Sequence, residues 1–262
     1  MNAGVSWEET TVPIAGTAVR VRRAGSGRPL LILHHDFGSP DDLPVYDALA
    51  AGFAVIRPEH PGFGHSERPE WMRSARDLAV LYRLLLGELG IDKATLLGLG
   101  FGGWLAAEMA TMAPADIDRL VLVGAMGIQP PEGYIVDQAL IGYLDYARAA
   151  FHTDAAFAAV WGAEPSNDQL ELWDICREMC FRIAWKPYMY SQTLPNLLQS
   201  MQAETLVVWG EQDRIVPISA CEAYMAALPN ARQVTVAGCG HAVDMEKPEE
   251  LARLVTEFAG AA

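Results

Sequence analysis

Cysteines and basic residues are scarce in this sequence. The four cysteines, Cys176, Cys180, Cys221 and Cys239, form no C-x-x-C pair, which favours reduced thiols and a cytoplasmic location. Only 19 Lys and Arg residues stand against 33 Asp and Glu residues, giving a formal net charge of −14. Because binding to a phosphate backbone needs clustered basic side chains, we expect neither nucleic acid nor an anionic membrane as a partner.

Long apolar runs are also lacking. No segment is long enough to span a bilayer, and no charged region followed by an apolar stretch opens the chain, so we expect neither an anchor nor a secretory leader. A hydrophobic fraction of 51% in 262 residues is still enough for one large folded domain. We therefore expect a globular protein that acts on a small molecule, with a homodimer as one assembly open to it.

Segments typical of strands alternate with segments typical of helices. Apolar runs predict strands at 19–23, 30–34, 54–57, 94–98, 120–123, 205–209 and 233–236, and helical periodicity predicts helices at 74–89, 101–112, 219–228 and 248–258. Such apolar strands favour a mostly parallel sheet that is covered on both faces. Between about 128 and 201 the alternation stops, and amphipathic, aromatic-rich stretches follow. We predict an α/β core formed by 1–127 and 202–262, with a helical lid inserted at 128–201.

The segment Leu96-Leu97-Gly98-Leu99-Gly100-Phe101-Gly102-Gly103-Trp104 lacks the residue on which its pattern depends. In a G-x-S-x-G nucleophile elbow, a serine on a strained turn between a strand and a helix presents its hydroxyl to the substrate. Here Gly100 takes that position. Glycine relieves the backbone strain and leaves room where a hydroxyl would stand. An acyl-enzyme therefore cannot form at this residue.

Four further motifs accompany the elbow. They are His34-His35-Asp36-Phe37-Gly38, Pro58-Glu59-His60-Pro61-Gly62-Phe63-Gly64-His65-Ser66, Trp209-Gly210-Glu211-Gln212-Asp213-Arg214-Ile215-Val216-Pro217 and Gly238-Cys239-Gly240-His241. With all five in order between about residues 19 and 258, the chain resembles α/β-hydrolase-fold proteins of the lidded esterase and carbon–carbon bond hydrolase type. The resemblance implies a mostly parallel central sheet flanked by helices, with an inserted helical lid.

The resemblance also implies roles for individual residues. Asp213 and His241 correspond to the catalytic acid and base, in the chain order nucleophile, acid, histidine, with Gly100 at the nucleophile position. A buried carboxylate holds the imidazole in one tautomer and stabilises its positive charge. The amide of Phe101 and a loop amide near Asp36 correspond to the oxyanion donors. We expect His35 and Phe37 of the same loop to border the substrate.

Two loops depart from the family pattern. The family usually reads His-Gly-x-x-Gly where this chain reads His34-His35-Asp36-Phe37-Gly38, and the following motif commonly begins with Asp and an apolar residue rather than Glu59-His60. In the family's strand order both loops lie near Gly100, at the carboxyl ends of the strands.

These departures allow two interpretations. In the first, His35, Glu59, His60 and His241 hold a divalent zinc, manganese or iron ion, which lowers the pKa of a bound water and replaces the missing nucleophile. In the second, His34 and Glu59 only brace the loops, as their equivalents commonly do in the family, and no metal is needed. We predict no other cofactor.

The remaining residues are suited to activating water. We predict a hydrolase of a small apolar or aromatic ester, lactone or related carbonyl compound, in which His241 and Asp213 activate water with or without the metal. Three alternatives stay open. The chain could be a serine hydrolase inactivated in the laboratory by a serine-to-glycine change, although such a change does not account for His35. It could also be a lyase or cyclase, or a ligand-binding protein on the same fold.

Overall fold

An eight-stranded sheet forms the centre of the computed structural model, which describes residues 5–260. Its order is β1-β2-β4-β3-β5-β6-β7-β8. β1 pairs with β2, and β2 pairs with β4, in the antiparallel direction. Every other neighbouring pair is parallel. The strands are β1 (Glu8–Ile14), β2 (Thr17–Ala24), β3 (Arg28–Leu33), β4 (Phe53–Pro58), β5 (Ala94–Leu99), β6 (Ile117–Val123), β7 (Thr205–Gly210) and β8 (Ala231–Val236). This arrangement confirms the predicted fold class.

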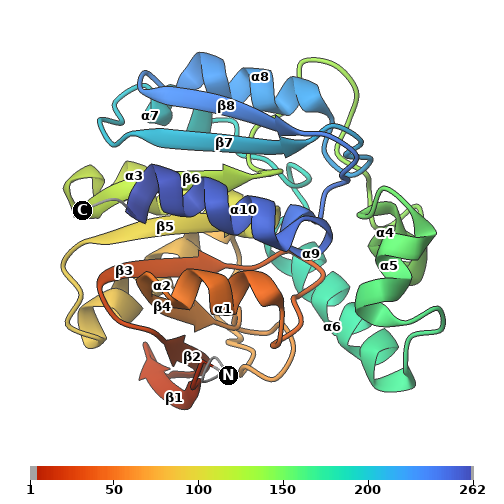
Figure 1. Cartoon of the computed structure of the whole chain (residues 1–262), viewed down its shortest axis with the longest axis horizontal. Helices are drawn as coiled ribbons and strands as arrows, with labels where there is room; N and C mark the ends of the chain where they lie inside the picture. Colours follow the sequence, from red (N-terminus) through yellow and green to blue (C-terminus); the bar gives the residue numbers. More distant parts are fainter. Residues whose placement is uncertain (1–4, 261–262) are drawn as a thin grey trace.

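Helices cover both faces of the sheet (Figure 1). On one face, α1 (Pro44–Ala50) packs against α10 (Pro248–Val255), which follows the short α9 (Val243–Glu246) and continues as a π-helical turn at Thr256–Gly260. On the other face, α2 (Ala75–Glu88) packs against α3 (Phe101–Met112), and a 3₁₀ turn, Pro114–Asp116, connects α3 to β6. Because both faces are covered, every residue of β5 and of β7 is buried.

Local sequence explains where α2 begins. The Ser74 hydroxyl accepts a hydrogen bond from the Asp77 amide and so caps the start of α2, one residue inside the predicted range. The sequence analysis did not predict β1 or α1. The exposed and partly buried residues that make up most of β1 are those of an edge strand with few apolar positions, and α1 has only seven residues. Neither element carries enough periodicity to stand out.

A long segment, residues 124–204, is inserted between β6 and β7 and carries four helices. These are α4 (Tyr143–Ala149), α5 (Asp154–Trp161), α6 (Asn167–Ile183) and α7 (Leu194–Leu198). The first three stand together beyond the carboxyl ends of the strands, at the right of Figure 1. After β7, α8 (Ile218–Ala227) returns to the sheet beside β7 and β8. The part of the inserted segment that carries α4, α5 and α6 therefore lies at the sheet edge where the elbow is, whereas α7 packs against α3 and α8.

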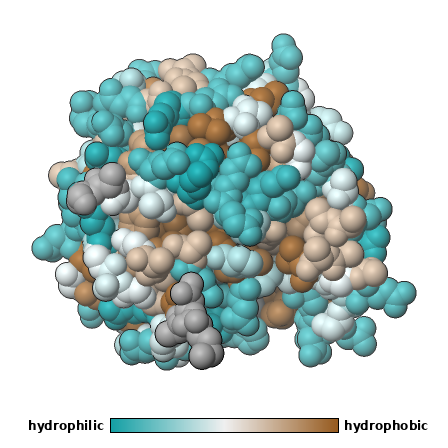
Figure 2. Space-filling model, viewed as in Figure 1, coloured by the Kyte–Doolittle hydropathy of each residue, from teal (hydrophilic) through white to brown (hydrophobic). Residues whose placement is uncertain are grey.

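The surface seen in Figure 2 is mainly hydrophilic, with apolar side chains in smaller groups among polar ones. Among the helices of residues 5–260, none has the length and the apolar character needed to cross a bilayer. All four cysteines are buried and free. Cys176 and Cys180, one turn apart on α6, are thus packing residues of the inserted segment.

Candidate active site

Gly100 occupies the sharp turn between β5 and α3. Its φ of 53° and ψ of −112° lie in the region that favours glycine. Backbone hydrogen bonds fix the turn: the Gly100 amide donates to the Val123 carbonyl at 2.9 Å, and the Gly102 amide donates to the His34 carbonyl at 3.0 Å. A Cβ on Gly102 would come within 2.1 Å of the Leu33 carbonyl oxygen, so helix and sheet approach more closely than a side chain allows. The elbow is therefore tied to the end of β6 and to the loop that follows β3.

His241 and Asp213 form a buried pair beside this turn. Nδ1 of His241 donates to Oδ2 of Asp213 at 2.8 Å, and Oδ1 of Asp213 accepts the amides of Ile215 and Val216 at 2.8 and 2.9 Å. Nε2 of His241 faces Gly100 and lies 2.7 Å from the position that a Cβ would take there. Burial opposes charging of this imidazole, but the charges of Asp213, Asp36 and Asp244 prevail and raise the pKa of His241. The pair is thus arranged as a base with its orienting carboxylate.

His35 approaches the same turn from the loop after β3. Its Nε2 donates to Oδ1 of Asp244 at 2.8 Å, which leaves Nδ1 unprotonated in the neutral ring. That Nδ1 lies 2.6 Å from the Cβ position of Gly100. The rings of His35 and His241 have centroids 5.1 Å apart and planes inclined at 57°. Two buried imidazoles, each held by a buried carboxylate, therefore face one point above Gly100.

Asp36 completes this group, and residues of the inserted segment hold it. Oδ2 of Asp36 accepts the hydroxyl of Tyr146 at 2.7 Å and also the side-chain amide of Gln138. The carboxyl group is fully buried, and burial raises the pKa of Asp36. Its Oδ1 has no hydrogen-bond partner among the described residues. The inserted segment and the core therefore meet at this carboxylate.

The candidate metal ligands of residues 5–260 form a single group, His35, Asp36 and His241. Each residue offers a ligand atom, and these atoms all lie within 4.8 Å of one another. Nδ1 of His35 and Nε2 of His241 are buried without a hydrogen-bond partner in the described part of the chain, as is Oδ1 of Asp36. This group shares His35 and His241 with the predicted ligand set.

The structure corrects the predicted ligand set at His60. Its ring stacks on His34 with centroids 3.6 Å apart, its Nδ1 contacts the Tyr82 hydroxyl, and its Nε2 donates to the His34 carbonyl at 3.0 Å. Burial holds the pKa of His60 well below its ordinary value and lowers the pKa of His34 to about 3. Nε2 of His34 accepts the His60 amide at 2.8 Å. These two neutral rings bridge loops and hold no free nitrogen for a metal.

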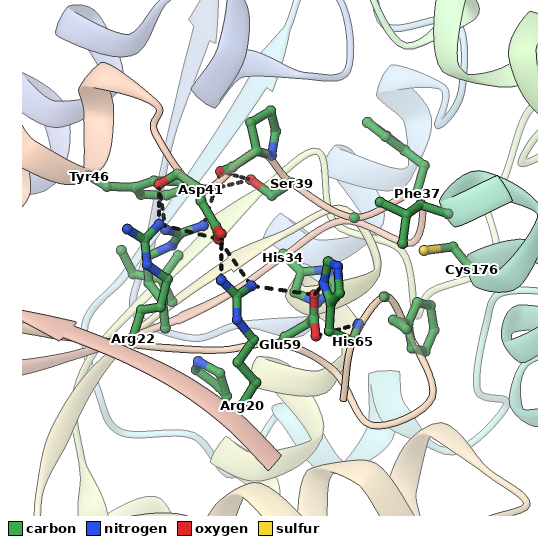
Figure 3. A pocket seen from close by; sticks show the side chains of 18 of the residues that line it. Arg20, Arg22, His34, Phe37, Ser39, Asp41, Tyr46, Glu59, His65 and Cys176 are labelled. Carbon is green, nitrogen blue, oxygen red and sulfur yellow. Dashed lines mark hydrogen bonds and ion pairs between the residues drawn. The ribbon is translucent and has the colours of Figure 1, made fainter. Parts of the chain in front are cut away.

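Glu59 is the second correction. Its carboxylate accepts the amides of His65 and Ser66, each at 2.7 Å, and faces Arg20 at 3.6 Å (Figure 3). The side chain therefore braces the turn that follows it instead of joining the group above Gly100. Nearness of two motifs at a sheet edge does not fix side-chain direction, and here the amides of its own turn orient Glu59.

A cavity of about 210 Å³ lies beside the site and is the subject of Figure 3. Phe37, Cys176 and Trp161 supply apolar wall, and the ring of Phe37 also stacks on His35 at 4.9 Å between centroids. On the polar side, carboxylates pair with arginines, as Asp41 does with Arg20 at 2.6 Å. Phe37 therefore contacts both the cavity and the imidazole group.

Phe101 and several aromatic side chains of the inserted segment are buried among other aromatic rings. The ring of Phe101 is buried against Phe63 and Trp104, and its amide opens α3, where the helix dipole is positive. Within the inserted segment, Phe157 packs on Phe151 and Trp173, so these aromatic side chains form that segment's own core.

The sequence analysis did not single out Asp244, Gln138 or Tyr146 as site residues. Asp244 lies 209 residues from the histidine that it holds, and Gln138 and Tyr146 lie 102 and 110 residues from Asp36. No local motif signals such contacts. Only the approach of the inserted segment to the sheet edge brings them together.

The sequence and the structure were also compared with known proteins. Residues 30–254 match the alpha/beta hydrolase family. A 2-hydroxymuconate semialdehyde hydrolase from Pseudomonas putida is 27% identical over 280 residues, spanning 93% of this chain and 91% of the relative. Among solved structures, a bacterial membrane phospholipase A shows a TM-score of 0.79 at 22% identity, over 97% of this chain and 86% of that one. A meta-cleavage product hydrolase shows a TM-score of 0.76 at 24% identity, over 95% and 97%.

Proposed function

We propose that this chain, which belongs to the alpha/beta hydrolase family, hydrolyses a carbon–carbon bond next to a ketone in a small apolar or aromatic substrate, without an acyl-enzyme. The observation that carries the proposal is the position of His241 Nε2, which faces Gly100 while Asp213 holds Nδ1. A base poised where a nucleophile would stand is suited to activating water. Similarity to a 2-hydroxymuconate semialdehyde hydrolase supports the choice of a carbon–carbon bond.

The proposed reaction needs only water. His241 takes a proton from water as the oxygen bonds to the ketone carbon, and Asp213 stabilises the imidazolium that forms. The Phe101 amide at the start of α3 donates to the oxyanion. When the carbonyl re-forms, the bond to the neighbouring carbon breaks, the electron pair is delocalised onto a second, conjugated carbonyl of a diketone substrate, and that carbon receives the proton from His241. The products are a carboxylic acid and a shorter carbonyl compound.

His35 supports Gly100 as the working residue rather than a replaced serine. A Cβ at position 100 would lie 2.6 Å from Nδ1 of His35 and 2.7 Å from Nε2 of His241. Both rings are buried, and each is anchored by a carboxylate, so a serine would require both to move. The position of the His35 ring therefore requires that residue 100 has no side chain.

We further propose that the inserted segment acts as the lid and helps to bind the substrate. The cavity beside Phe37 and Trp161 offers an apolar wall for the hydrocarbon part of the substrate. Gln138 and Tyr146 hold Asp36 at the boundary between lid and core. An arrangement of this kind shields the reacting carbonyl from bulk water.

Turnover of a panel of esters, lactones and vinylogous diketones tests this function. We expect product from the diketones, one oxygen from isotopically labelled water in the acid product, and no inhibition by organophosphonates. A covalent acyl-protein trapped by rapid quenching would contradict the mechanism. Saturable binding of the panel without any product would contradict the function and would favour a ligand-binding protein.

A further inference from the structure

We propose that His35, Asp36 and His241 bind a divalent first-row metal ion directly above Gly100, through Nδ1, Oδ1 and Nε2. The use of this ion to activate water rests on the proposed function, whereas binding itself does not. Neither Glu59 nor His60 takes part.

The first argument is the state of the three donor atoms. All three atoms belong to fully buried residues, and none has a hydrogen-bond partner within residues 5–260. A buried polar atom without a partner costs about 1–3 kcal/mol. Three such atoms, all in one group of ligand atoms within 4.8 Å, point to a shared partner that accepts electron pairs.

The second argument is the carboxylate that is bound to the other ring nitrogen of each imidazole. Nε2 of His35 donates to Asp244, and Nδ1 of His241 donates to Asp213, both at 2.8 Å. Metal-binding histidines almost always donate their other ring N–H in this way, because the carboxylate fixes the tautomer and makes the ligand nitrogen more basic. A catalytic acid and base need one such pair, and this site has two.

The third argument is space and donor chemistry. The two ring nitrogens flank the Cβ position of Gly100, at 2.6 and 2.7 Å, so glycine keeps this volume free of protein atoms. Two imidazoles and one carboxylate are a donor set that suits zinc with an open position for water, and also iron(II). Because metal bonds of about 2.0–2.2 Å draw ligand atoms together, small rotations of the side chains would complete the site.

Metal binding would change the role of His241. Its Nε2 would be a ligand and could no longer accept a proton from water. The ion would instead lower the pKa of a bound water towards neutrality, so the same hydrolysis would proceed with metal-bound hydroxide as the nucleophile. The bound water would lose its proton to solvent, and the carbon that keeps the electron pair would take a proton from solvent in place of His241, so the overall reaction stays the same.

A calorimetric titration of the metal-stripped full-length protein with Zn²⁺ tests the proposal. We expect one equivalent to bind, and the visible spectrum of the Co²⁺-substituted protein to report nitrogen and oxygen ligands. His35→Gln and His241→Gln should each weaken binding at least about 100-fold, and Asp244→Asn about 10–100-fold. The matched control His65→Gln should leave the affinity unchanged, because this ring is exposed and contacts Glu59.

Gly100→Ala gives an independent test, because it retains every ligand and adds only a methyl group between them. We expect it to abolish Zn²⁺ binding, with an unchanged circular dichroism spectrum showing that the variant is folded. Zn²⁺ binding that His35→Gln or Gly100→Ala leaves intact would overturn the proposal, as would no saturable binding at all. Full hydrolytic activity in metal-stripped protein would remove only the catalytic role of the ion. Absence of turnover with and without metal would contradict the proposed function and leave the binding result standing.

Discussion

Nδ1 of His35 lies 2.6 Å from the position that a Cβ would take on Gly100. The two residues are therefore one structural feature, since the imidazole can stand there only because residue 100 has no side chain. Asp244 anchors His35 from behind, at 2.8 Å, and so limits how far the ring can retreat.

Gly100→Ser should not restore a serine hydrolase. The added Cβ would clash with His35 and His241, so we expect kcat/KM to fall at least about 10-fold, equivalent to about 1.4 kcal/mol of transition-state stabilisation. Steady-state kinetics with the best diketone of the panel measures this. The double variant His35→Gly with Gly100→Ser should instead gain labelling by an organophosphonate, because the ring that obstructs the serine is gone. Labelling of the single variant to the same extent would contradict the link between the two residues.

In the metal-free protein, where His241 is the proposed base, Asp213→Asn should impair that base while preserving the fold. The amides of Ile215 and Val216 can still donate to the asparagine oxygen, but the side-chain NH₂ would then face Nδ1 of His241 and favour the wrong tautomer. We expect kcat to fall about 10²–10⁴-fold, the range that positioned base catalysis contributes. Asp42→Asn is the matched control, since the Asp42 side chain is 91% exposed. An unchanged kcat in Asp213→Asn would refute the role of His241 as the base, and it would also refute Asp213 as its support.

Tyr146→Phe should loosen the contact between the inserted segment and the core. The variant removes the 2.7 Å hydrogen bond to the buried Asp36 and leaves Gln138 as the other donor. Because Oδ2 of Asp36 keeps one donor, we expect the free energy of unfolding to fall by about 0.5–1.5 kcal/mol, measured by urea denaturation. Tyr134→Phe serves as the control, because Tyr134 is 74% exposed. Equal stability of both variants would show that this contact contributes little.

Stability should fall as the solution becomes more acidic than about pH 6.5. In the folded protein burial lowers the pKa of His34 from 6.5 to about 3, and it lowers the pKa of His60 in the same direction. Between these values the unfolded chain binds protons that the folded chain does not, so each ring destabilises the fold by up to about 1.4 kcal/mol per pH unit. Urea denaturation at pH 7 and pH 5 measures the loss, and His60→Gln should reduce it. The same pH dependence in that variant would exclude His60 as a source.

The sequence by itself determined the fold, and its resemblance to α/β-hydrolase-fold proteins predicted Asp213 and His241 as the candidate acid and base. Their motifs are local: a buried strand followed by a glycine-rich turn specifies the elbow, and a strand end followed by Gly-Glu-Gln-Asp places the acid. The predicted strands and helices agree with the structure because apolar runs and helical periodicity are set by neighbouring residues. The departure at His35 was also visible in the sequence.

Only the tertiary structure decided which side chains meet. In the structure Glu59 and His60 form hydrogen bonds that support nearby loops, whereas Asp36 lies close to His35 and His241. It also supplied Asp244, whose contact with His35 spans 209 residues. The physical reason is that a motif fixes where the backbone goes, whereas the direction of a polar side chain is set by whichever donors and acceptors the rest of the fold brings within about 3 Å of it.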